Sequence, residues 1–460
     1  MPLFSKITAL EISIIIGLMK WKIAPFLIAA LLLAVLLTAW LLAPRVEGIE
    51  PVESPLHGVQ PLSISFSRPM NPETVESNIL FQPPIQGNFS WNEKLNKVSI
   101  VPRKSWPPGE PITVQVESGA RSRLNLPLLG EKSWTFMVSP TLLVYLWPAD
   151  GKSNLYQANP DTGENQALTF EKNGVLDYSV TPDGLSIVYS VVNEEGEGLI
   201  VSLDRLSGTT TTLIECSPGL CRAPQISPDG STLAYSFISP DAGVQPGVRV
   251  YDLDKNTGIF LGDPEDYLDH LMWSPAGWLS FYNYTQQRYV FWDPVSSQEI
   301  TLPNETGGDG SWSGDGKYFV SSEILFISET LAPRHLLLYD LSEETLLDLS
   351  QGNFLEDLNP SFSHQDLFLA FSRKSLDPQE WSPGRQLWIM DLGAGEGIPL
   401  TAAVDYHHTS FSWHPDDTKL AYVRYNQAKL SDPPEIWLIN PDGTENIRLI
   451  INGFAPSWIP

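Results

Sequence analysis

Two short segments contain residue types that could support chemistry, but neither has the spacing that the chemistry requires. A serine nucleophile at a sharp strand-to-helix turn needs Gly-x-Ser-x-Gly, whereas in segment 310–314 the serines flank a central tryptophan. His407 and His408 are adjacent, whereas a helical zinc site needs His-Glu-x-x-His, which does not occur. We therefore expect this histidine pair in a solvated loop, and we find no catalytic motif.

The sequence of segment 252–258 resembles a calcium-binding loop. Its glycine is displaced by one residue, and no glutamate stands where it could bind calcium through both oxygens. We interpret the segment as the turn of a hairpin. No residue is predicted to be catalytic, to ligate a metal or to bind a cofactor, and no cofactor is predicted.

The chain has two cysteines, Cys216 and Cys221, with a Ser-Pro-Gly-Leu segment between them. Two cysteines cannot supply a disulfide framework or a cysteine-based zinc site, so core packing must hold the fold together. In an oxidising compartment the pair could form a disulfide across this turn; the alternative is two free thiols. We favour the disulfide, and no nearby residue resembles a base that would activate a catalytic thiol.

The composition indicates a folded, strand-rich protein. Apolar residues make up 42% and aromatic residues 11% of the chain, and 39 prolines and 33 glycines indicate many turns between short strands. The net charge of −26 opposes binding to nucleic acid, because that recognition relies on basic patches.

Residues 23–43 are predicted to form one transmembrane helix. The stretch is uncharged, and at ~1.5 Å per residue it would span about 32 Å, enough for a bilayer core. Lysines precede it and glutamates follow it, so the positive-inside rule places residues 1–22 in the cytoplasm and the bulk of the chain outside. A cleaved signal peptide is the alternative. No small-x-small cleavage site follows the apolar run, so we favour a single-pass anchor in the cell membrane.

Residues 48–138 are predicted to form a small β-sandwich. Apolar and polar residues alternate with period two, as in Leu62-Ser-Ile-Ser-Phe66, the pattern of strands with one buried face. Three sequence segments resemble the bacterial Ig-like domains found beside surface-layer modules: SISFSRPMNPETV, GNFSWNEKLNKVSIVP and SWTFMV. The resemblance implies a spacer or adhesive module without chemistry, in which Trp91 would fill the centre of the sandwich.

A sequence motif recurs six times between residues 179 and 423. Each copy has an apolar strand, a Pro-Asp-Gly type of turn and a second apolar strand. The copies are spaced 39 to 51 residues apart, as expected for propeller blades. A second hairpin lies between copies, so each repeat supplies four strands. Motifs such as QISPDGSTLAYS resemble the TolB-like repeats of bacterial envelope proteins. The resemblance covers residues 141–460 and implies a β-propeller.

Seven blades are favoured over six. Residues 141–170 supply three strands of a blade without its first, and Phe454–Pro460 reads as a lone first strand, so pairing the two ends would close the ring. The aspartates and glycines of the repeated turn are interpreted as turn formers. One aromatic position of the repeat is predicted to lie in the core between blades, and it is occupied by Trp273, Trp312, Phe362, Trp413 and Trp458.

The sequence thus predicts an all-β, membrane-anchored, extracytoplasmic protein whose propeller is a non-catalytic scaffold. Its expected partner is another envelope protein or a cell-wall polymer. The alternative function is an enzyme acting on an envelope glycan or small ester through a site in the propeller funnel. A third is a sensory ectodomain, which would need a partner for its output. The sequence identifies neither ligand nor binding face.

Overall fold

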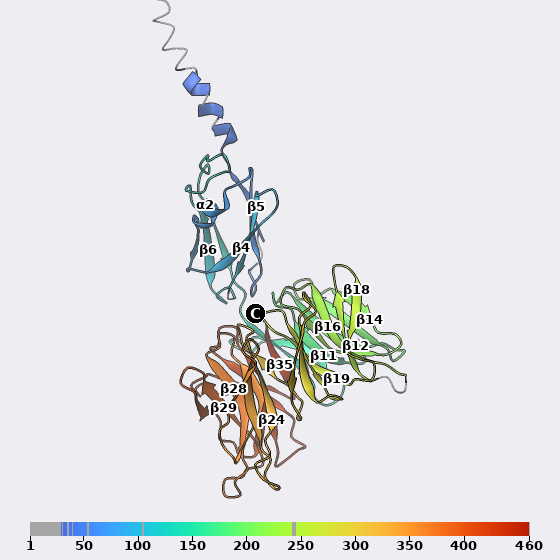
Figure 1. Cartoon of the computed structure of the whole chain (residues 1–460). Helices are drawn as coiled ribbons and strands as arrows, with labels where there is room; N and C mark the ends of the chain where they lie inside the picture. Colours follow the sequence, from blue (N-terminus) through green and yellow to red (C-terminus); the bar gives the residue numbers. More distant parts are fainter. Residues whose placement is uncertain are drawn as a thin grey trace, which may run out of the picture. The chain divides into compact units, whose positions relative to one another are not determined.

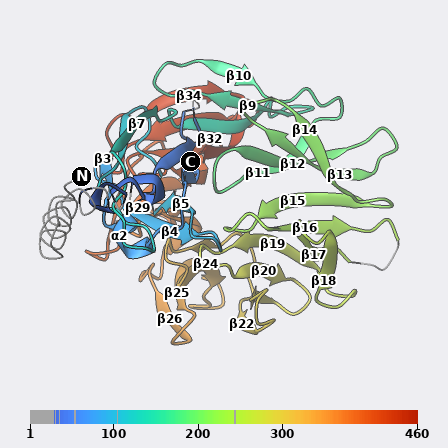
Figure 2. The same ribbon diagram turned by 90° about the horizontal axis from the view of Figure 1, so that it is seen from above.

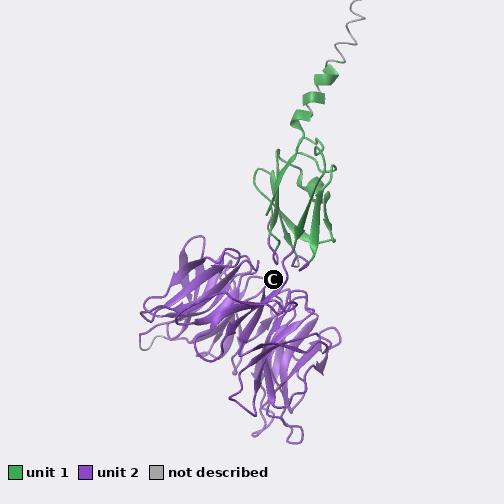
Figure 3. Cartoon of the chain, turned by 180° about the vertical axis from the view of Figure 1, so that it is seen from behind, with its two compact units in different colours: residues 1–56, 61–103, 110–137 green, residues 57–60, 104–109, 138–460 purple. Residues whose placement is uncertain are grey.

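The computed structural model describes residues 29, 31–34, 36–38, 40–52, 55–103, 105–241 and 245–459. These residues form two compact units (Figures 1 and 3). Unit 1 contains residues up to 56 together with 61–103 and 110–137, and unit 2 contains residues 57–60, 104–109 and 138–460. We describe each unit by itself.

The predicted transmembrane segment lies only partly within the described residues. The described residues from 29 to 42 are helical, whereas 1–28, 30, 35 and 39 lie outside the description. Across the part of the chain that is described, we find no helix with both the length and the apolar character needed to cross a membrane. The anchor over residues 23–43 therefore stays a prediction.

Unit 1 is a two-sheet sandwich. One sheet has the order β1-β2-β5-β4 and the other β3-β6-β7. The strands are β1 (Val46–Glu50), β2 (Leu62–Phe66), β3 (Ile79–Gln82), β4 (Gly87–Trp91), β5 (Lys97–Pro102), β6 (Pro111–Val116) and β7 (Lys132–Met137), with a short helix α2 (Pro72–Glu76) between β2 and β3. The alternating residues of β2, β5 and β6 are fully buried between the sheets, as their period-two pattern predicts.

Two details of unit 1 differ from the prediction. Trp91 is only half-buried at the end of edge strand β4, where its indole N–H donates to Glu76 and its ring stacks on Phe66. Fully buried aliphatic residues fill the centre instead, so Trp91 covers one side of the core. In addition, β1 starts at Val46, before the predicted boundary at residue 48, because a register shift between Val46 and Gly48 hides the alternation there.

Unit 2 contains seven four-stranded antiparallel sheets among its described residues. They follow one another around a ring in chain order (Figure 2), and we call them blades 1 to 7. Blade 1 has the order β35-β8-β9-β10, from β35 (Phe454–Ile459), β8 (Leu142–Trp147), β9 (Asn154–Ala158) and β10 (Asn165–Ala167). The other six blades are each built from four consecutive strands.

The strands of blades 2 to 4 have the following bounds. Blade 2 is β11 (Val175–Val180), β12 (Ser186–Val192), β13 (Gly198–Asp204) and β14 (Thr210–Glu215). Blade 3 is β15 (Leu220–Ile226), β16 (Thr232–Ile238), β17 (Gly247–Asp252) and β18 (Thr257–Leu261). Blade 4 is β19 (Leu268–Trp273), β20 (Leu279–Asn283), β21 (Arg288–Trp292) and β22 (Glu299–Pro303).

Blades 5 to 7 complete the ring. Blade 5 is β23 (Ser311–Trp312), β24 (Tyr318–Ile324), β25 (Arg334–Asp340) and β26 (Thr345–Asp348). Blade 6 is β27 (Leu355–Phe362), β28 (Phe368–Ser375), β29 (Gln386–Asp391) and β30 (Glu396–Pro399). Blade 7 is β31 (Tyr406–Trp413), β32 (Leu420–Asn426), β33 (Glu435–Ile439) and β34 (Ile447–Ile451).

The two ends of the propeller sequence meet in blade 1. Ile459 of β35 pairs with Leu142 of β8, so the last described strand completes the sheet begun by the first. Buried hydrophobic clusters join each neighbouring pair of blades, and one of them packs Trp458 and Tyr145 of blade 1 against blade 7. The ring is therefore closed by both pairing and packing.

Antiparallel pairing gives every blade two distinct ends. We label the strands of a blade A to D from the inside outward, so that turns A–B and C–D lie at one end, and loops B–C and D–A at the other. We call these the A–B end and the B–C end. Leu142, at the start of β8, pairs with Ile459, at the end of β35, so both residues lie at the A–B end of blade 1.

The repeated aromatic position lies in the core between blades, as predicted. Trp273, Trp312, Phe362, Trp413 and Trp458 are all at most 9% exposed. The indole N–H of Trp413 donates to the carbonyl of Ser361 on the preceding blade at 3.0 Å, and that of Trp458 donates to Ser412 in the same way. This position therefore combines apolar burial with a hydrogen bond between blades.

The A–B turns are held by their aspartates. In blade 3, Asp229 accepts hydrogen bonds from the hydroxyl of Ser227 and the backbone N–H of Ser231, which is the turn-forming role predicted for it. Blades 6 and 7 have aspartate instead of glycine at the next, left-handed position of the turn. Asp417 reaches across to the turn of blade 6, where it accepts the backbone N–H groups of His364 and Gln365, both at 2.8 Å.

Candidate functional site: the B–C end of the propeller

A bulge recurs in the innermost strands. In β15, β19, β27, β31 and β35, two residues oppose a single residue of the neighbouring strand. The first residue of each bulge has a positive φ although it is not glycine, and these residues are Ala223, His270, Asn359, Ser410 and Ala455. A bulge reorients the side chains that follow it, so one repeat position is set apart on the inner strands.

Blade 4 places a histidine at this position, and its side chain joins a three-residue relay. His270 Nδ1 lies 2.7 Å from Asp309 Oδ1, and His270 Nε2 lies 2.7 Å from the hydroxyl of Tyr284. Asp309 comes from the D–A loop before β23, and Tyr284 from the B–C loop of blade 4. The side chain of Asp309 is 70% exposed and that of His270 27%, so the relay is accessible to solvent.

The relay shifts the acidity of its members. Burial lowers the pKa of His270, but the hydrogen bond to Asp309 and the charges of Asp309 and Asp269 outweigh it, so the pKa is raised. The hydrogen bond from His270 holds the pKa of Asp309 below its ordinary value. Burial, followed by the charges of Asp269 and Asp309, raises the pKa of Tyr284. Tyr284 therefore keeps its proton at neutral pH, and the relay can donate a hydrogen bond or exchange a proton.

Further ionisable groups continue from the relay along the inner strands. Arg222 of β15 pairs with Asp177 of β11 at 2.9 Å, and Asp269 precedes His270 in β19. Tyr267 stacks on Tyr284 with ring centroids 4.7 Å apart. Across the described residues, no group of three or more His, Cys, Asp or Glu side chains is arranged to hold a metal ion. The inner strands of blades 2 to 5 therefore offer hydrogen-bonding and charged groups.

The B–C end also exposes large apolar side chains. Six of them, each more than 40% exposed, lie in five successive loops of blades 5 to 7: Phe326, Ile327, Phe354, Trp381, Val404 and Leu430. At the A–B end, large exposed apolar residues are fewer and scattered, as in Leu206 and Val295 of two C–D turns and Leu367 of an A–B turn. Isolated exposed apolar residues are normal, but several gathered on one face mark an interaction site.

Backbone hydrogen bonds connect the last four of these loops into one surface. The N–H of Leu376 donates to the carbonyl of Phe354, and the N–H of Gly384 donates to that of Val404. The N–H of Gln427 donates to the carbonyl of Asp405, next to Val404. We call the loops 349–354, 376–385, 400–405 and 427–434 the apolar loop surface.

The two adjacent histidines lie beside this surface, and the expectation of a solvated loop is wrong. They belong to inner strand β31, where His408 is fully buried and its Nδ1 lies 2.8 Å from the carbonyl of Arg385. Burial lowers the pKa of both histidines to about 4, with Arg385 contributing for His407. Both are therefore neutral at physiological pH, and the ring of His408 packs against that of Tyr422. The sequence hid this because the burial of His408 depends on residues distant in the chain.

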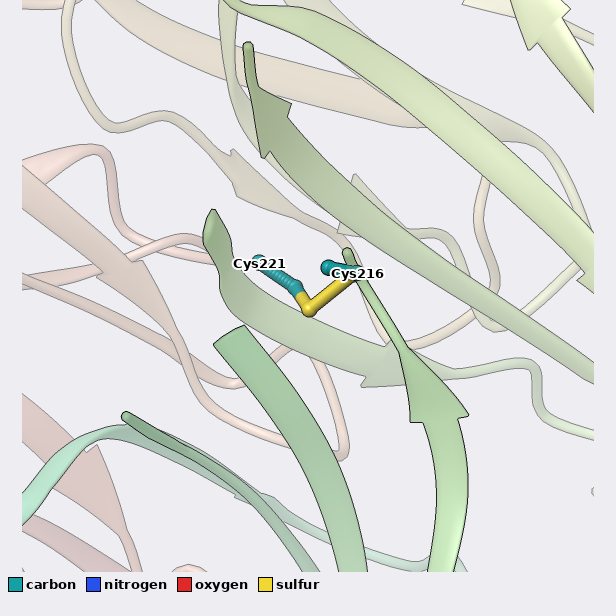
Figure 4. Close-up of a disulfide and its surroundings, with 2 residues drawn as sticks. All are labelled: Cys216 and Cys221. Carbon is teal, nitrogen blue, oxygen red and sulfur yellow. A yellow bond between two sulfur atoms is a disulfide. The ribbon is translucent and has the colours of Figure 1, made fainter. Parts of the chain in front are cut away.

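The structure also places the other segments singled out in the sequence. Cys216 and Cys221 form a disulfide between the end of β14 and β15, where both are buried (Figure 4). Segment 252–258 contains the C–D turn of blade 3, and Asp252 accepts the backbone N–H groups of Asp254 and Lys255 there. In segment 310–314, Ser311 accepts the backbone N–H of Phe362, which is a structural bond between blades 5 and 6.

Sequence reasoning missed both the relay and the apolar loop surface. His270, Tyr284 and Asp309 are separated along the chain. One signal was available: His270 and Asp309 each stand three residues before a repeated tryptophan, where other repeats have Ala223, Asn359, Ser410 and Ala455. A histidine among small residues at a repeated position would have marked the site.

The fold and this geometry define a two-part protein, in which an Ig-like sandwich precedes a β-propeller. Residues 42–138 match the family of bacterial Ig-like domains. The chain thus carries the predicted bacterial Ig-like domain, and the match begins before the predicted start at residue 48. A β-propeller follows it, as the repeats predict.

Several solved structures are similar to this chain. TolB from Acinetobacter baumannii is 13% identical over 83% of each chain, with a TM-score of 0.42. The β-propeller domain of the Trilobed protease from Pyrococcus furiosus is 12% identical over 75% of this chain and 93% of that domain, with a TM-score of 0.49. A structure from a study of two prolyl endopeptidases is 13% identical over 75% of this chain and 48% of that one, with a TM-score of 0.50. At such identities the likeness concerns the fold alone. No curated protein matches the sequence.

Proposed function

We propose that this protein is a membrane-anchored, extracytoplasmic scaffold whose seven-bladed propeller binds another envelope protein without catalysis. The apolar loop surface is the binding face, and the Ig-like domain is a spacer between this propeller and an anchor at residues 23–43. The observation that carries the proposal is the concentration of exposed large apolar side chains in successive loops of one propeller end.

The surface has the composition of an interface core. Trp381 and Phe354 are 57% and 48% exposed, and aromatic residues of this kind dominate the binding energy of protein interfaces. The ammonium of Lys374 lies 4.5 Å from the centre of the Trp381 ring. Arg385, at the end of loop 376–385, forms an ion pair with Glu356, and both side chains are mostly buried. A cell-wall polymer is less favoured, because a polar polymer gains little from exposed aliphatic residues such as Val404 and Leu430.

The test compares two double variants of the full chain as baits in native membranes. Phe354→Ser with Trp381→Ser removes the aromatic groups of the surface, and Leu206→Ser with Val295→Ser is the control at the A–B end. We expect the first to lower recovery of crosslinked partner about tenfold or more, since hot-spot aromatic residues contribute about 2 kcal/mol or more each. Equal recovery by both variants, or no reproducible partner with the wild type, would contradict the proposal.

The relay supports one second candidate, an enzyme that acts on an envelope glycan or small ester. Asp309 orients His270, and His270 faces the hydroxyl of Tyr284, which is an arrangement suited to proton transfer. Turnover of ester and glycan substrates by the full chain would support this candidate if both His270→Gln and Tyr284→Phe abolish it. Turnover that survives both substitutions would eliminate the relay as its source.

A further inference from the structure

A pocket of about 460 Å³ lies between blades 4 and 5. Its lining comes from the B–C loop of blade 4, the D–A loop that follows β22, the end of β24 and the neighbouring parts of blade 5. The volume is in the range of small-molecule and side-chain sites. The pocket is separate from the apolar loop surface and from the His270 relay, since no residue of either lines it; of the six exposed apolar residues described above, only Phe326 does.

The charged groups of the pocket lining are all acidic. Leu302, Pro303, Ile324, Leu337, Leu346 and Phe326 supply apolar surface, and the polar groups are three amides, one serine hydroxyl and two carboxylates, those of Glu305 and Glu323. None of the described lining residues is a lysine, arginine or histidine. The pocket therefore has two negative charges without a cation in its wall.

The two glutamates are held close together. The carboxylate of Glu323 accepts the backbone N–H of Glu305 at 3.1 Å, and it also accepts the N–H of Ile324 and the hydroxyl of Thr306. Burial raises the pKa of Glu323, the three hydrogen bonds oppose this effect, and the charge of Glu305 raises the pKa further. A positive group between the two carboxylates would remove their repulsion.

Phe326 supplies the other half of a cation site. Its side chain is 72% exposed and borders the same pocket, so a ligand in the pocket can contact the ring. A cation gains from an aromatic face as well as from carboxylates, and the aliphatic stem of a long basic side chain can lie on the apolar floor.

We propose that this pocket binds an arginine or lysine side chain presented by the partner protein, an inference that rests on the proposed scaffold function. The stem lies on Leu302, Ile324 and Leu346, and the charged end lies between Glu305, Glu323 and the ring of Phe326. The partner therefore combines an apolar patch for the apolar loop surface with a basic residue for the pocket.

The test uses the full chain in detergent and the probe Nα-acetyl-arginine methylamide, with the corresponding citrulline compound as a neutral ligand of the same shape. By calorimetry we expect a dissociation constant of roughly 1–10 mM for the arginine probe and binding about tenfold weaker for citrulline. Glu305→Gln and Glu323→Gln should each weaken the arginine probe about fivefold to tenfold. Glu299→Gln, on β22 but outside the pocket lining, should leave binding unchanged.

Equal binding of the two probes, unchanged binding in both pocket variants, or no binding at about 20 mM would overturn the inference. Glu305→Gln removes an exposed carboxylate, so it tests the site even if Glu323→Gln destabilises the loop; thermal melting of each variant checks this. The partner capture described above separates the two proposals. If Glu305→Gln captures the partner as well as the wild type while the Phe354 and Trp381 variant does not, the scaffold function stands and the pocket inference falls.

Discussion

The A–B end and the B–C end of the propeller are built from the same strands, yet they differ in almost every other respect. The A–B end repeats one solution, in which short turns are held by an aspartate such as Asp229. The B–C end has longer loops of unequal length, the histidine relay, a pocket and the exposed apolar residues. The difference indicates that the repeated residues maintain the ring, whereas the groups proposed to bind ligands and partners occur only once.

Removal of the closing strand should have the largest effect on stability. Deleting residues 454–460 exposes the partners of Trp458 and Ile459, which are 5% and 2% exposed. It also removes the hydrogen bond that Tyr178 donates to Ala455. We expect a loss of at least about 5 kcal/mol and a melting temperature lower by roughly 10 °C or more. Calorimetry of the full chain measures the change in melting temperature. An unchanged propeller transition would show that the stability of the ring does not depend on β35.

Two tryptophans provide the most direct comparison of the ends. Trp413→Ala removes a side chain that is 3% exposed, packed between blades 6 and 7 and hydrogen-bonded to Ser361. We expect it to cost about 3–5 kcal/mol. Trp381→Ala removes one that is 57% exposed, so its effect on stability should be within about 0.5 kcal/mol. Denaturant unfolding measures the free energy of unfolding of both variants. Similar losses of stability would mean that Trp381 is structural.

The sequence predicted most of the A–B end, because repetition makes structure visible. A turn of the Pro-Asp-Gly type followed by an apolar strand has a local physical cause, and six copies fixed the hairpins and the aromatic core position. Positions that occur once gave no such signal. His408 was misread because its burial depends on Arg385, more than twenty residues earlier in the chain.

The binding groups were less predictable, since they are brought together only by the closed ring. Tyr284 and Asp309 reach His270 from two different loops, and Glu305, from the same loop as Asp309, bonds to Glu323 of the neighbouring blade. Exposure is also a property of the folded surface: Trp381 and Trp413 look alike in the sequence, and only the fold shows that one is exposed and the other buried.

The hydrogen bonds between Asp417 and the A–B turn of blade 6 offer a smaller test of the A–B end. Asp417 occupies a left-handed position, with φ of 62°, where blades 2 to 5 have glycine. Asp417→Gly therefore keeps the turn conformation and removes only the two bonds to His364 and Gln365. We expect a loss of about 1–3 kcal/mol, because both backbone N–H groups lose a charged acceptor. Asp366→Gly in blade 6, which removes the equivalent bonds from Gly314 and Asp315, should behave alike. No measurable loss from either would mean that water replaces the carboxylate at no cost.

The smallest expected effect concerns the relay, where the exposed pair is screened by solvent. Because the folded pKa of His270 is raised, its contribution to stability is full below about 6.5 and is lost as the pH rises through the folded value. Because the pKa of Asp309 is lowered, its contribution is present above about 3.8 and is lost as the pH falls. The stabilising effect of the pair is therefore greatest between about pH 4 and 6.5, and it should stay below about 1 kcal/mol.

Proton NMR of the His270 ring, assigned with His270→Gln, gives the sharper measurement. We expect a titration midpoint above the ordinary 6.5 in the wild type. In Asp309→Asn the midpoint should fall, since the partner carboxylate is removed while the burial that lowers the pKa remains. A wild-type midpoint below 6.5 would show that burial outweighs the aspartate, and the B–C end would then present a neutral histidine to its ligand at all physiological pH values. A midpoint that does not move in Asp309→Asn would instead assign the shift to Asp269, and the relay would lose its orienting carboxylate.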